Sequence, residues 1–328
     1  MLAVEKREKP LIMAWIGKDE PLRGDSQMAV GLGRLCAEMT GGQYVYVDKK
    51  MLDDNFPKAR DYLEQQQLLI KKMGTPDILI GACEASSVYY DVCDKQPIVT
   101  MAHIGETVSH RYGGNGLVPH NLNDELLATE KAKFKAHYPN IKGPLVAVMV
   151  AGVHMLDSQL IRDLQAMAKN YDEITFFFCP NRRSKALTPL LVRQMRYDLS
   201  SVFQENTLKD YVQNLFSRNK PNVLTVNYNA AVKGYNPYVG LLANADHIVV
   251  SGHSYSMISD ALYMEKTVHI NSNDDKFAAL IERGHLRLTH DFNKLDQFPT
   301  KPMPRVDVTR KVAELMVEKY NLGTPVAL

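Results

Sequence analysis

The chain has 328 residues, a length that suggests two domains of ordinary size. Hydrophobic residues make up 45% and charged residues 23% of the sequence, as is typical of a globular protein. The formal net charge of +2 excludes a strong overall basic excess, so we expect no nucleic-acid partner.

The sequence shows no segment that would export or anchor the chain. The apolar run 11–17 is too short for a signal sequence, and no apolar run reaches the roughly 18 residues that span a bilayer. Cys36 and Cys179 lie in apolar segments, where buried reduced thiols are expected. We therefore expect a cytoplasmic protein, for which peripheral contact with a membrane surface stays open.

In the first half of the chain, short apolar runs alternate with segments of helical periodicity. We expect strands at Leu11–Gly17, 43–48, Pro76–Ala82, Pro97–Ile104 and 116–120. We expect helices at Asp25–Met39, Lys58–Met73 and Asn123–His137, the first of them with Asp25 or Ser26 as N-cap.

The second half repeats this alternation after the segment 138–144, whose prolines and glycine are typical of a linker. Leu160, Ile161, Leu164 and Met167 form the apolar stripe of one predicted helix. We expect further strands at Leu145–Gly152, Glu173–Pro180, Asn222–Asn227, His247–Gly252 and Thr267–Asn271, and a last helix within 306–322.

Buried strands that are separated by helices form parallel sheets with right-handed crossovers. The sequence therefore predicts an α/β fold of two Rossmann-like parallel-sheet domains that face a cleft. The expected domains cover residues 1–140 and 141–305, and residues 306–328 are expected to form a helix that packs back on the N-terminal domain. Ligands of such sheets bind at the carboxyl ends of the strands, so we look for function in the loops that follow them.

The loop after the first strand, 17–27, places glycines and charged residues in front of a helix. Backbone N–H groups at the start of a helix attract anions. The P-loop pattern is absent, and the glycines of GLGRLC lie inside the predicted helix. An anion site and an ordinary turn with an Asp or Ser cap both fit this loop.

Two loops of the second half carry stronger signals. Gly152 ends one predicted strand, and Arg182 and Arg183 follow the next one, directly before a helix. Adjacent arginines at the end of a strand can bind a diphosphate through paired hydrogen bonds. A solvated basic turn is the alternative.

The segment SGHSYSMISD, residues 251–260, connects a predicted strand to a predicted helix. The hydroxyls of Ser254 and Ser256 can hold a phosphate at the start of this helix. Asp260 can accept hydrogen bonds from sugar or ribose hydroxyls. Capping of the helix by the serines is the structural alternative.

A further alternative for the same segment is nucleophilic catalysis by Ser254, because GHSYS differs at one position from the motif G-x-S-x-G. Asp274 or Asp275 with His285 or His290 would then complete the triad. No histidine spacing is typical of a metal site, so we expect no metal and no required cofactor.

Several motifs together resemble the mitochondrial-fission "elongated mitochondria" family, which is known from plants and bacteria. In chain order they are GDSQMAVGLGRL, PDILIGA, GPLVAVMVAG, NRRSKALTP and NPYVGLLANADHIVVSGHSYSMISDALYMEKTVHI. The resemblance covers residues 12–290, and the last motif is the most specific. It implies a glycosyltransferase-B-like fold with a nucleotide-sugar cleft between an N-terminal acceptor domain and a C-terminal donor domain. The matching positions are Gly24, Gln27, Arg182, Arg183, Asn236, Pro237, Tyr238, Ala245, Asp246, Ser254, Ser256, Met257 and Ser259.

The chain departs from the family pattern at the implied donor site. His253 stands where the family has aspartate, and Asp260 stands where glutamate is usual. In plants the family is associated with recruiting a dynamin-like fission protein to mitochondria. The resemblance therefore implies an adaptor role as well as an enzymatic one.

From the resemblance we expect a metal-independent, glycosyltransferase-like protein that binds a UDP-type nucleotide-sugar and a lipid-linked or saccharide acceptor. Arg182 and Arg183 would neutralise the leaving diphosphate. The candidates for the general base are Asp19, Asp25 and His120. The alternatives are a non-catalytic scaffold that binds a protein partner or a membrane surface, and a serine hydrolase at Ser254.

Overall fold

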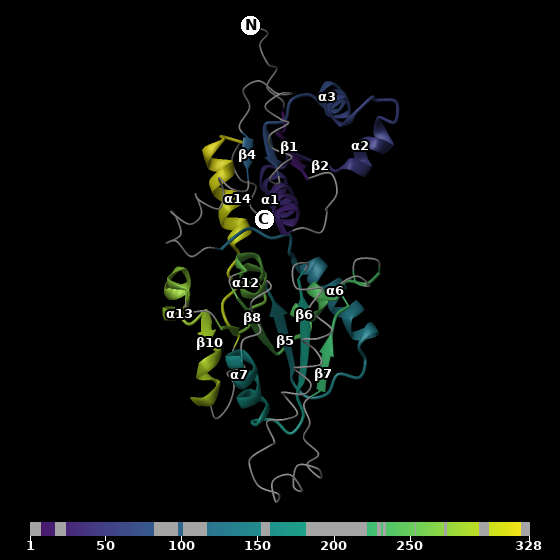
Figure 1. Cartoon of the computed structure of the whole chain (residues 1–328). Coiled ribbons are helices and arrows are strands. Elements are labelled where there is room, and N and C mark those ends of the chain that lie inside the picture. Colours follow the sequence, from purple (N-terminus) through teal and green to yellow (C-terminus); the bar gives the residue numbers. More distant parts are fainter. Residues whose placement is uncertain are drawn as a thin grey trace, which may run out of the picture. The chain divides into compact units, whose positions relative to one another are not determined.

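The computed structural model describes residues 8–16, 24–81, 98–100, 117–151, 158–181, 222–227, 231, 234–252, 254–271, 274–294 and 302–322. The chain divides into two compact units, which consist of Met1–Asn121 with Asp307–Leu328 and of Leu122–Val306. Each unit is built on a parallel sheet (Figure 1). This architecture confirms the predicted α/β fold of two Rossmann-like units, whereas the cleft between them stays a prediction.

The first unit contains a parallel sheet of four strands in the order β2-β1-β3-β4. The strands are β1 (Leu11–Trp15), β2 (Gln43–Val47), β3 (Ile78–Gly81) and β4 (Ile98–Thr100). Helix α1 (Gly24–Thr40) leads from β1 to β2. All side chains of β1 and β3 are buried, as expected for central strands of a parallel sheet that is covered on both faces.

Two helices between β2 and β3 differ from the single helix predicted at Lys58–Met73. Helix α2 (Lys49–Asn55) begins after Asp48, whose carboxylate accepts a hydrogen bond from the Met51 backbone N–H at 2.6 Å. Helix α3 (Tyr62–Met73) begins after Asp61, which caps the Glu64 N–H at 2.8 Å. Because an aspartate in extended conformation is a strong N-cap, these two residues decide where the helices start.

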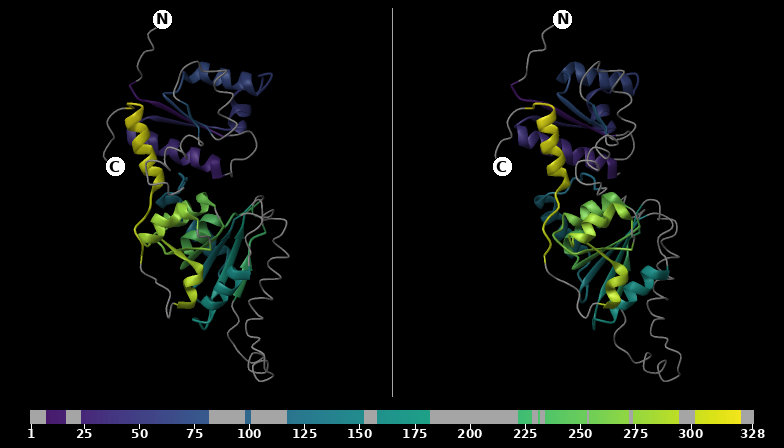
Figure 2. Two further views of the ribbon diagram at one scale, coloured as in Figure 1. Left: turned by 60° about the vertical axis from the view of Figure 1, so that its left-hand side comes forward. Right: turned by 90° about the vertical axis from the view of Figure 1, so that its left-hand side faces the viewer.

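Helix α14 (Val308–Lys319) returns the chain to the first unit and lies beside α1 in every view (Figure 1, Figure 2). Thr309 at its start binds the backbone of His120: its hydroxyl accepts the His120 N–H at 2.8 Å and donates to the His120 carbonyl at 3.0 Å. On the other side Gly31 of α1 approaches closely, since a Cβ there would lie 2.0 Å from the same carbonyl. The described part of the predicted strand 116–120 is therefore irregular chain held by two helices.

The second unit contains a parallel sheet of six strands in the order β10-β9-β8-β5-β6-β7. The strands are β5 (Leu145–Val150), β6 (Thr175–Pro180), β7 (Asn222–Thr225), β8 (His247–Ser251), β9 (Val268–Ile270) and β10 (Leu286–Leu288). Five of these strands match the predicted runs. Strand β10 was not predicted, because three residues at a sheet edge carry too little apolar pattern to be recognised.

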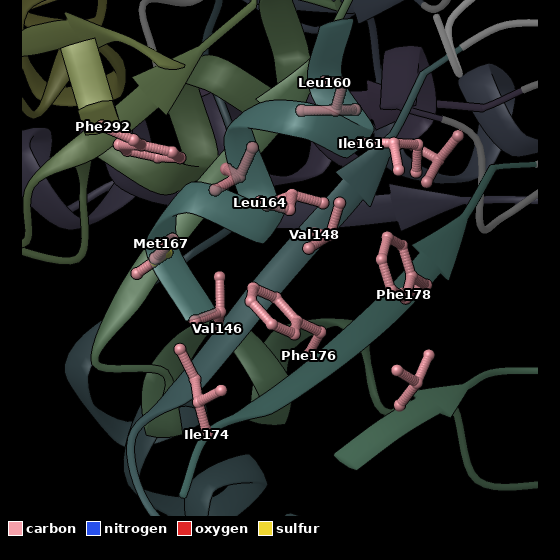
Figure 3. Packing of buried hydrophobic residues seen from close by; sticks show 13 residues of the cluster. Val146, Val148, Leu160, Ile161, Leu164, Met167, Ile174, Phe176, Phe178 and Phe292 are labelled. Atoms are coloured by element: carbon pink, nitrogen blue, oxygen red, sulfur yellow. The ribbon is translucent and has the colours of Figure 1, made fainter. Parts of the chain in front are cut away.

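Helix α7 (Ser158–Ala168) supplies the predicted apolar stripe to the core of this unit. Figure 3 shows Leu160, Leu164 and Met167 of α7 over the sheet, next to Val146 and Val148 of β5 and to Phe176 and Phe178 of β6. At about 25 cal/mol per Å² of buried apolar surface, such a cluster is a main source of the unit's stability.

Helix α6 (Asp124–His137) belongs to the second unit, although the predicted domain boundary lies at residue 140. Phe134 of α6 packs against Phe177 of β6 with ring centroids 5.6 Å apart. Helix α11 (Tyr238–Asn244) approaches α6 through Gly240, where a Cβ would lie 2.6 Å from the Glu130 carbonyl. The units therefore divide between residues 121 and 122 and again between 306 and 307, where α14 begins its return.

Two predictions for the chain as a whole concern its cysteines and segments that could cross a membrane. Cys36 and Cys179 are buried and not in disulfides, as predicted, while Cys83 and Cys93 lie outside the described residues. Within the described ranges, no helix combines the length and the apolar character needed to cross a membrane.

Candidate functional site

The strand order of the second unit marks one place where a ligand is expected. In chain order the six strands lie 3-2-1-4-5-6 across the sheet, which is the order of doubly wound dinucleotide-binding units. Strands β5 and β8 are neighbours in the sheet, with Val150 opposite Ser251. After β5 the next strands are added on one side of this pair, and after β8 they are added on the other side. Because the connections diverge at this switch point, the carboxyl ends of β5 and β8 are where a sheet of this order binds its ligand.

A glycine and an asparagine fix the way the chain leaves β8. Gly252 has a φ of 78°, a left-handed conformation that favours glycine. Its N–H donates to the side-chain oxygen of Asn271 at 2.8 Å, directly after β9. Asn271 was predicted only as the end of a strand. Its contact with Gly252 aligns the loop with the neighbouring strand.

Helix α12 (Tyr255–Leu262) begins at the switch point without the side-chain cap that was predicted for it. Ser254 occupies the N-cap position, and its carbonyl accepts the Ile258 N–H at 3.0 Å, but its hydroxyl makes no capping bond. Instead the hydroxyl oxygens of Ser254 and Ser256 lie 3.4 Å apart. Both side chains are partly exposed. The two hydroxyls therefore stand together at the positive end of a helix dipole, where an anion is favoured.

Asp260 lies in the second turn of α12. Its Oδ2 accepts a hydrogen bond of 2.6 Å from the hydroxyl of Tyr238, the first residue of α11. Among the described residues this is the only hydrogen bond to the carboxyl group. The residue as a whole is only partly exposed, and a carboxylate that accepts one hydrogen bond keeps a second oxygen that can accept from another donor.

The surroundings of this pair change its proton affinities. Burial raises the pKa of Asp260 to about 7, and the hydrogen bond from Tyr238 partly opposes the shift because it favours the carboxylate. Burial and the adjacent carboxyl group raise the pKa of Tyr238, so the tyrosine keeps its proton and acts as the donor. A carboxyl group that titrates near neutrality at a switch point is typical of a functional site.

Two further residues flank the start of α12. Lys276 donates from its ammonium group to the hydroxyl of Tyr255 at 2.9 Å. The Tyr255 ring packs against Phe277 with centroids 5.5 Å apart. Lys276 lies in a short 3₁₀ helix, η1 (Asp275–Phe277). Asp274 caps this helix, because its side chain accepts a hydrogen bond from the Lys276 N–H. Lys276 was not predicted as a site residue, because a charged residue in a polar loop is ordinarily solvated.

Ser259, a predicted phosphate ligand, has a structural contact instead. Its side chain is 1% exposed, and its hydroxyl donates to the Tyr255 carbonyl one turn back at 2.9 Å. Serines inside helices commonly make this contact, which occupies the only hydroxyl proton. We therefore assign Ser259 to the helix and not to the ligand.

His120, a predicted base candidate, is buried in the first unit with 3% of its surface exposed. A catalytic role would require its imidazole to reach a substrate, and that role stays a prediction. Gly24 and Asp25 form the start of α1, so Asp25 lies inside the helix and not at its N-cap. The predicted site residues Asp19, Gly152, Arg182 and Arg183, and the neighbouring His253, lie outside the described residues.

The triad proposed for Ser254 finds no support in the described contacts. Asp274 caps the 3₁₀ helix η1, and the Nε2 of His290 lies 3.5 Å from the neighbouring Asp291. In the part of the chain that the structure describes, the contact given for the Ser254 hydroxyl is the hydroxyl of Ser256. In the described part of the chain, no three His, Cys, Asp or Glu side chains gather in a way that would hold a metal ion.

We compared the sequence of the chain with protein families and with curated proteins. A model of the family "Mitochondrial fission ELM1" matches residues 204–320, which include α11, β8 and α12. No curated protein is significantly similar in sequence to the chain.

Among solved structures, a UDP-GlcNAc 2-epimerase from Neisseria meningitidis bound to UDP-GlcNAc is similar with a TM-score of 0.52 and 11% identity, over 95% of this chain and 100% of that one. HepE from Anabaena, in complex with UDP and glucose, has a TM-score of 0.45 and 10% identity, over 95% of this chain and 96% of its own. A glycosyl transferase of family 9 from Veillonella parvula has a TM-score of 0.46 and 10% identity, over 97% and 99%.

At these identities the likeness shows the fold alone, and of these three structures only the epimerase exceeds a TM-score of 0.5. The fold is shared with the UDP-GlcNAc 2-epimerase and is glycosyltransferase-B-like. Over residues 204–320, the chain thus matches the mitochondrial-fission family that its motifs resemble, on a glycosyltransferase-B-like fold.

Proposed function

We propose that the protein binds a nucleotide-sugar of the UDP type in its second unit and acts as a metal-independent glycosyltransferase. The observation that carries this proposal is the start of α12 at the switch point of the six-stranded sheet, with the paired hydroxyls of Ser254 and Ser256 not used for capping. Phosphate groups bind well at such helix starts, because backbone N–H groups and the helix dipole both face them.

The remaining groups of the site fit the other parts of such a ligand. In this proposal Asp260, one turn farther along α12, accepts hydrogen bonds from the ribose. The fold is shared with an epimerase whose structure holds UDP-GlcNAc, and that ligand belongs to the same chemical class. Arg182 and Arg183, which follow β6 in the sequence, would neutralise the leaving diphosphate.

The transfer reaction needs a base for the acceptor hydroxyl. Asp19, Asp25 and His120 of the first unit are the proposed candidates, and a lipid-linked or saccharide hydroxyl is the proposed acceptor. The proposed mechanism requires no metal ion, because the arginines carry the positive charge that Mg²⁺ supplies in other transferases.

A thermal-shift panel of nucleotides and nucleotide-sugars tests the proposal. We expect UDP and a UDP-sugar to raise the unfolding temperature of the full chain, since a ligand that binds only the folded state stabilises it. Calorimetry should then show that Arg182→Ala with Arg183→Ala abolishes UDP binding. Undiminished affinity of this double variant would exclude the arginines from the site.

The same panel separates the alternatives. A non-catalytic scaffold, peripheral to a membrane or bound to a protein, is motivated by His253 and Asp260 standing at positions where the related family has other residues. This scaffold is favoured if no nucleotide stabilises the protein. A serine hydrolase would be labelled at Ser254 by a fluorophosphonate probe, and we expect no labelling.

A further inference from the structure

Tyr238 is held in a defined position next to the candidate site. Its backbone N–H donates to the side chain of Asn236 at 3.1 Å, and its hydroxyl donates to Asp260 at 2.6 Å. Tyr238 therefore holds the start of α11 through both its backbone N–H and its side-chain hydroxyl. The helix behind it cannot shift freely, because Gly240 lies in close contact with the backbone of α6.

The carboxyl group that Tyr238 contacts lies on the same face of α12 as one of the two serines. Ser256 and Asp260 are four residues apart, so they share a face and are separated by about 6 Å along the helix axis. The hydroxyl of Ser254 adjoins that of Ser256. A row of polar groups therefore runs along α12 from the hydroxyl pair to the carboxyl group, and Tyr238 stands at its end.

Resting on the proposed function, we propose that Tyr238 is a positioning residue, which holds the Asp260 carboxylate for the ribose, and that nucleotide-sugar binding is coupled to release of a proton from Asp260. One oxygen of the carboxylate is occupied by the tyrosine, and the other is left to accept a ribose hydroxyl. A fixed carboxylate loses less rotational freedom on binding than a mobile one, so the tyrosine favours the bound state.

The release of a proton on binding follows from the charge state of the Asp260 carboxyl group. A ribose hydroxyl donates best to an ionised carboxylate, whereas burial favours the neutral acid in the free protein. Among the described residues, the other titratable group that faces this pair is Cys179 of β6, whose buried thiol has a pKa raised to about 12 and is neutral at physiological pH. The pH dependence near neutrality is therefore assigned to Asp260.

Calorimetric titration of the full chain with UDP-N-acetylglucosamine between pH 6 and 8 tests this coupling. The diphosphate diester does not titrate in this range, so a change in affinity comes from the protein. With a carboxyl pKa near 7, the ionised fraction rises about tenfold between pH 6 and pH 8, and we expect the affinity to rise by the same factor. Buffers of different ionisation enthalpy should report a proton released at pH 6.

Three variants separate positioning from mere packing. Tyr238→Phe keeps the ring but removes the donor that stabilises the carboxylate, so the rise in affinity should move to higher pH and the affinity at pH 7 should fall severalfold. Asp260→Asn should bind weakly and without pH dependence. Tyr235→Phe is the matched control, because the Tyr235 hydroxyl donates to the Glu130 carbonyl and not to the site; it should keep the wild-type profile.

The outcomes distinguish this inference from the proposed function. Failure of the wild-type chain to bind at any pH overturns both. Binding without pH dependence, or a Tyr238→Phe profile equal to that of the wild type, overturns this inference alone. If Tyr238→Phe does not fold, equal pH profiles of the wild type and Asp260→Asn overturn it.

Discussion

At the scale of single residues, the two serines at the start of α12 carry the clearest prediction. Replacing Ser254 and Ser256 by alanine removes both hydroxyls but leaves the helix start intact, because neither hydroxyl caps it. We expect UDP affinity to fall at least about a hundredfold, because the loss of two hydrogen bonds to a charged group implies about 1.5–3 kcal/mol each.

Calorimetry with UDP measures this loss, and the matched control is the double threonine variant, which restores both hydroxyls. Threonine should recover most of the affinity, because it is also a common residue at the N-cap. An alanine pair that binds UDP as tightly as the wild type would show that the hydroxyls do not face the ligand.

A second residue-scale prediction concerns His269 of β9. Its ring is fully buried against Phe292, with centroids 4.7 Å apart. Burial, together with His247 and Arg287, lowers the pKa of His269 from 6.5 to about 3. The unfolded chain therefore takes up the proton first, so the contribution of His269 is complete above pH 6.5 and is lost as the pH falls toward 3.

Between pH 7 and pH 5 we expect His269 to reduce the free energy of unfolding by about 2 kcal/mol. Urea denaturation at both pH values measures the change. His269→Leu, which does not titrate, should lower stability somewhat at pH 7 but show a shallower loss on acidification. An equal loss in the variant and the wild type would assign the effect to other groups.

At the scale of secondary-structure elements, the packing of α6 on α11 depends on Gly240. An added Cβ would lie 2.6 Å from the Glu130 carbonyl and 2.7 Å from the Phe134 Cβ, so the two helices would have to separate. We expect Gly240→Ala to lower the free energy of unfolding by about 1–3 kcal/mol, the usual cost of overpacking.

Gly33 of α1 offers the comparison for this prediction. A Cβ there would lie 3.0 Å from a ring atom of Tyr44, which can rotate away, and 3.1 Å from the Ala14 Cβ, so both contacts are longer than those at Gly240. Urea denaturation should therefore show a smaller loss for Gly33→Ala than for Gly240→Ala. The reverse order would contradict the assigned contact between α6 and α11.

The elements also show what the sequence could and could not predict. The strands β5, β6 and β8 were predicted because long apolar runs are typical of strands buried on both faces. The edge strand β10 and the helix α2 were not, since β10 has only three residues and α2 is short and mostly polar. The helix α6 was predicted, but not its place in the second unit, because packing through Phe134 is a long-range contact.

The same limits apply to the candidate site. Ser254, Ser256 and Asp260 were found from the sequence because they follow a predicted strand on one continuous segment. The contact of Asp260 with Tyr238 joins residues that are 22 positions apart, and no local pattern reveals it. The hydrogen bond of Ser259 to the Tyr255 carbonyl was likewise not evident. The residues that line each face of a helix depend on where the helix begins, and the start of α12 was not known from the sequence.

At the scale of the whole molecule, the two units have different sheet orders. The first sheet runs β2-β1-β3-β4, and the second has the six-stranded order of dinucleotide-binding units. In the second unit the described loop after β8 carries the two serines at the switch point. The central claim is therefore that this end of the second sheet binds a nucleotide-sugar.

Hydrogen exchange of the full chain with and without saturating UDP-N-acetylglucosamine tests this claim most directly. A phosphate at the start of α12 would accept hydrogen bonds from its first backbone N–H groups, so exchange there must slow. We predict protection of the peptide that covers Gly252–Asp260. Unchanged exchange in this peptide, with protection elsewhere or nowhere, would contradict the account.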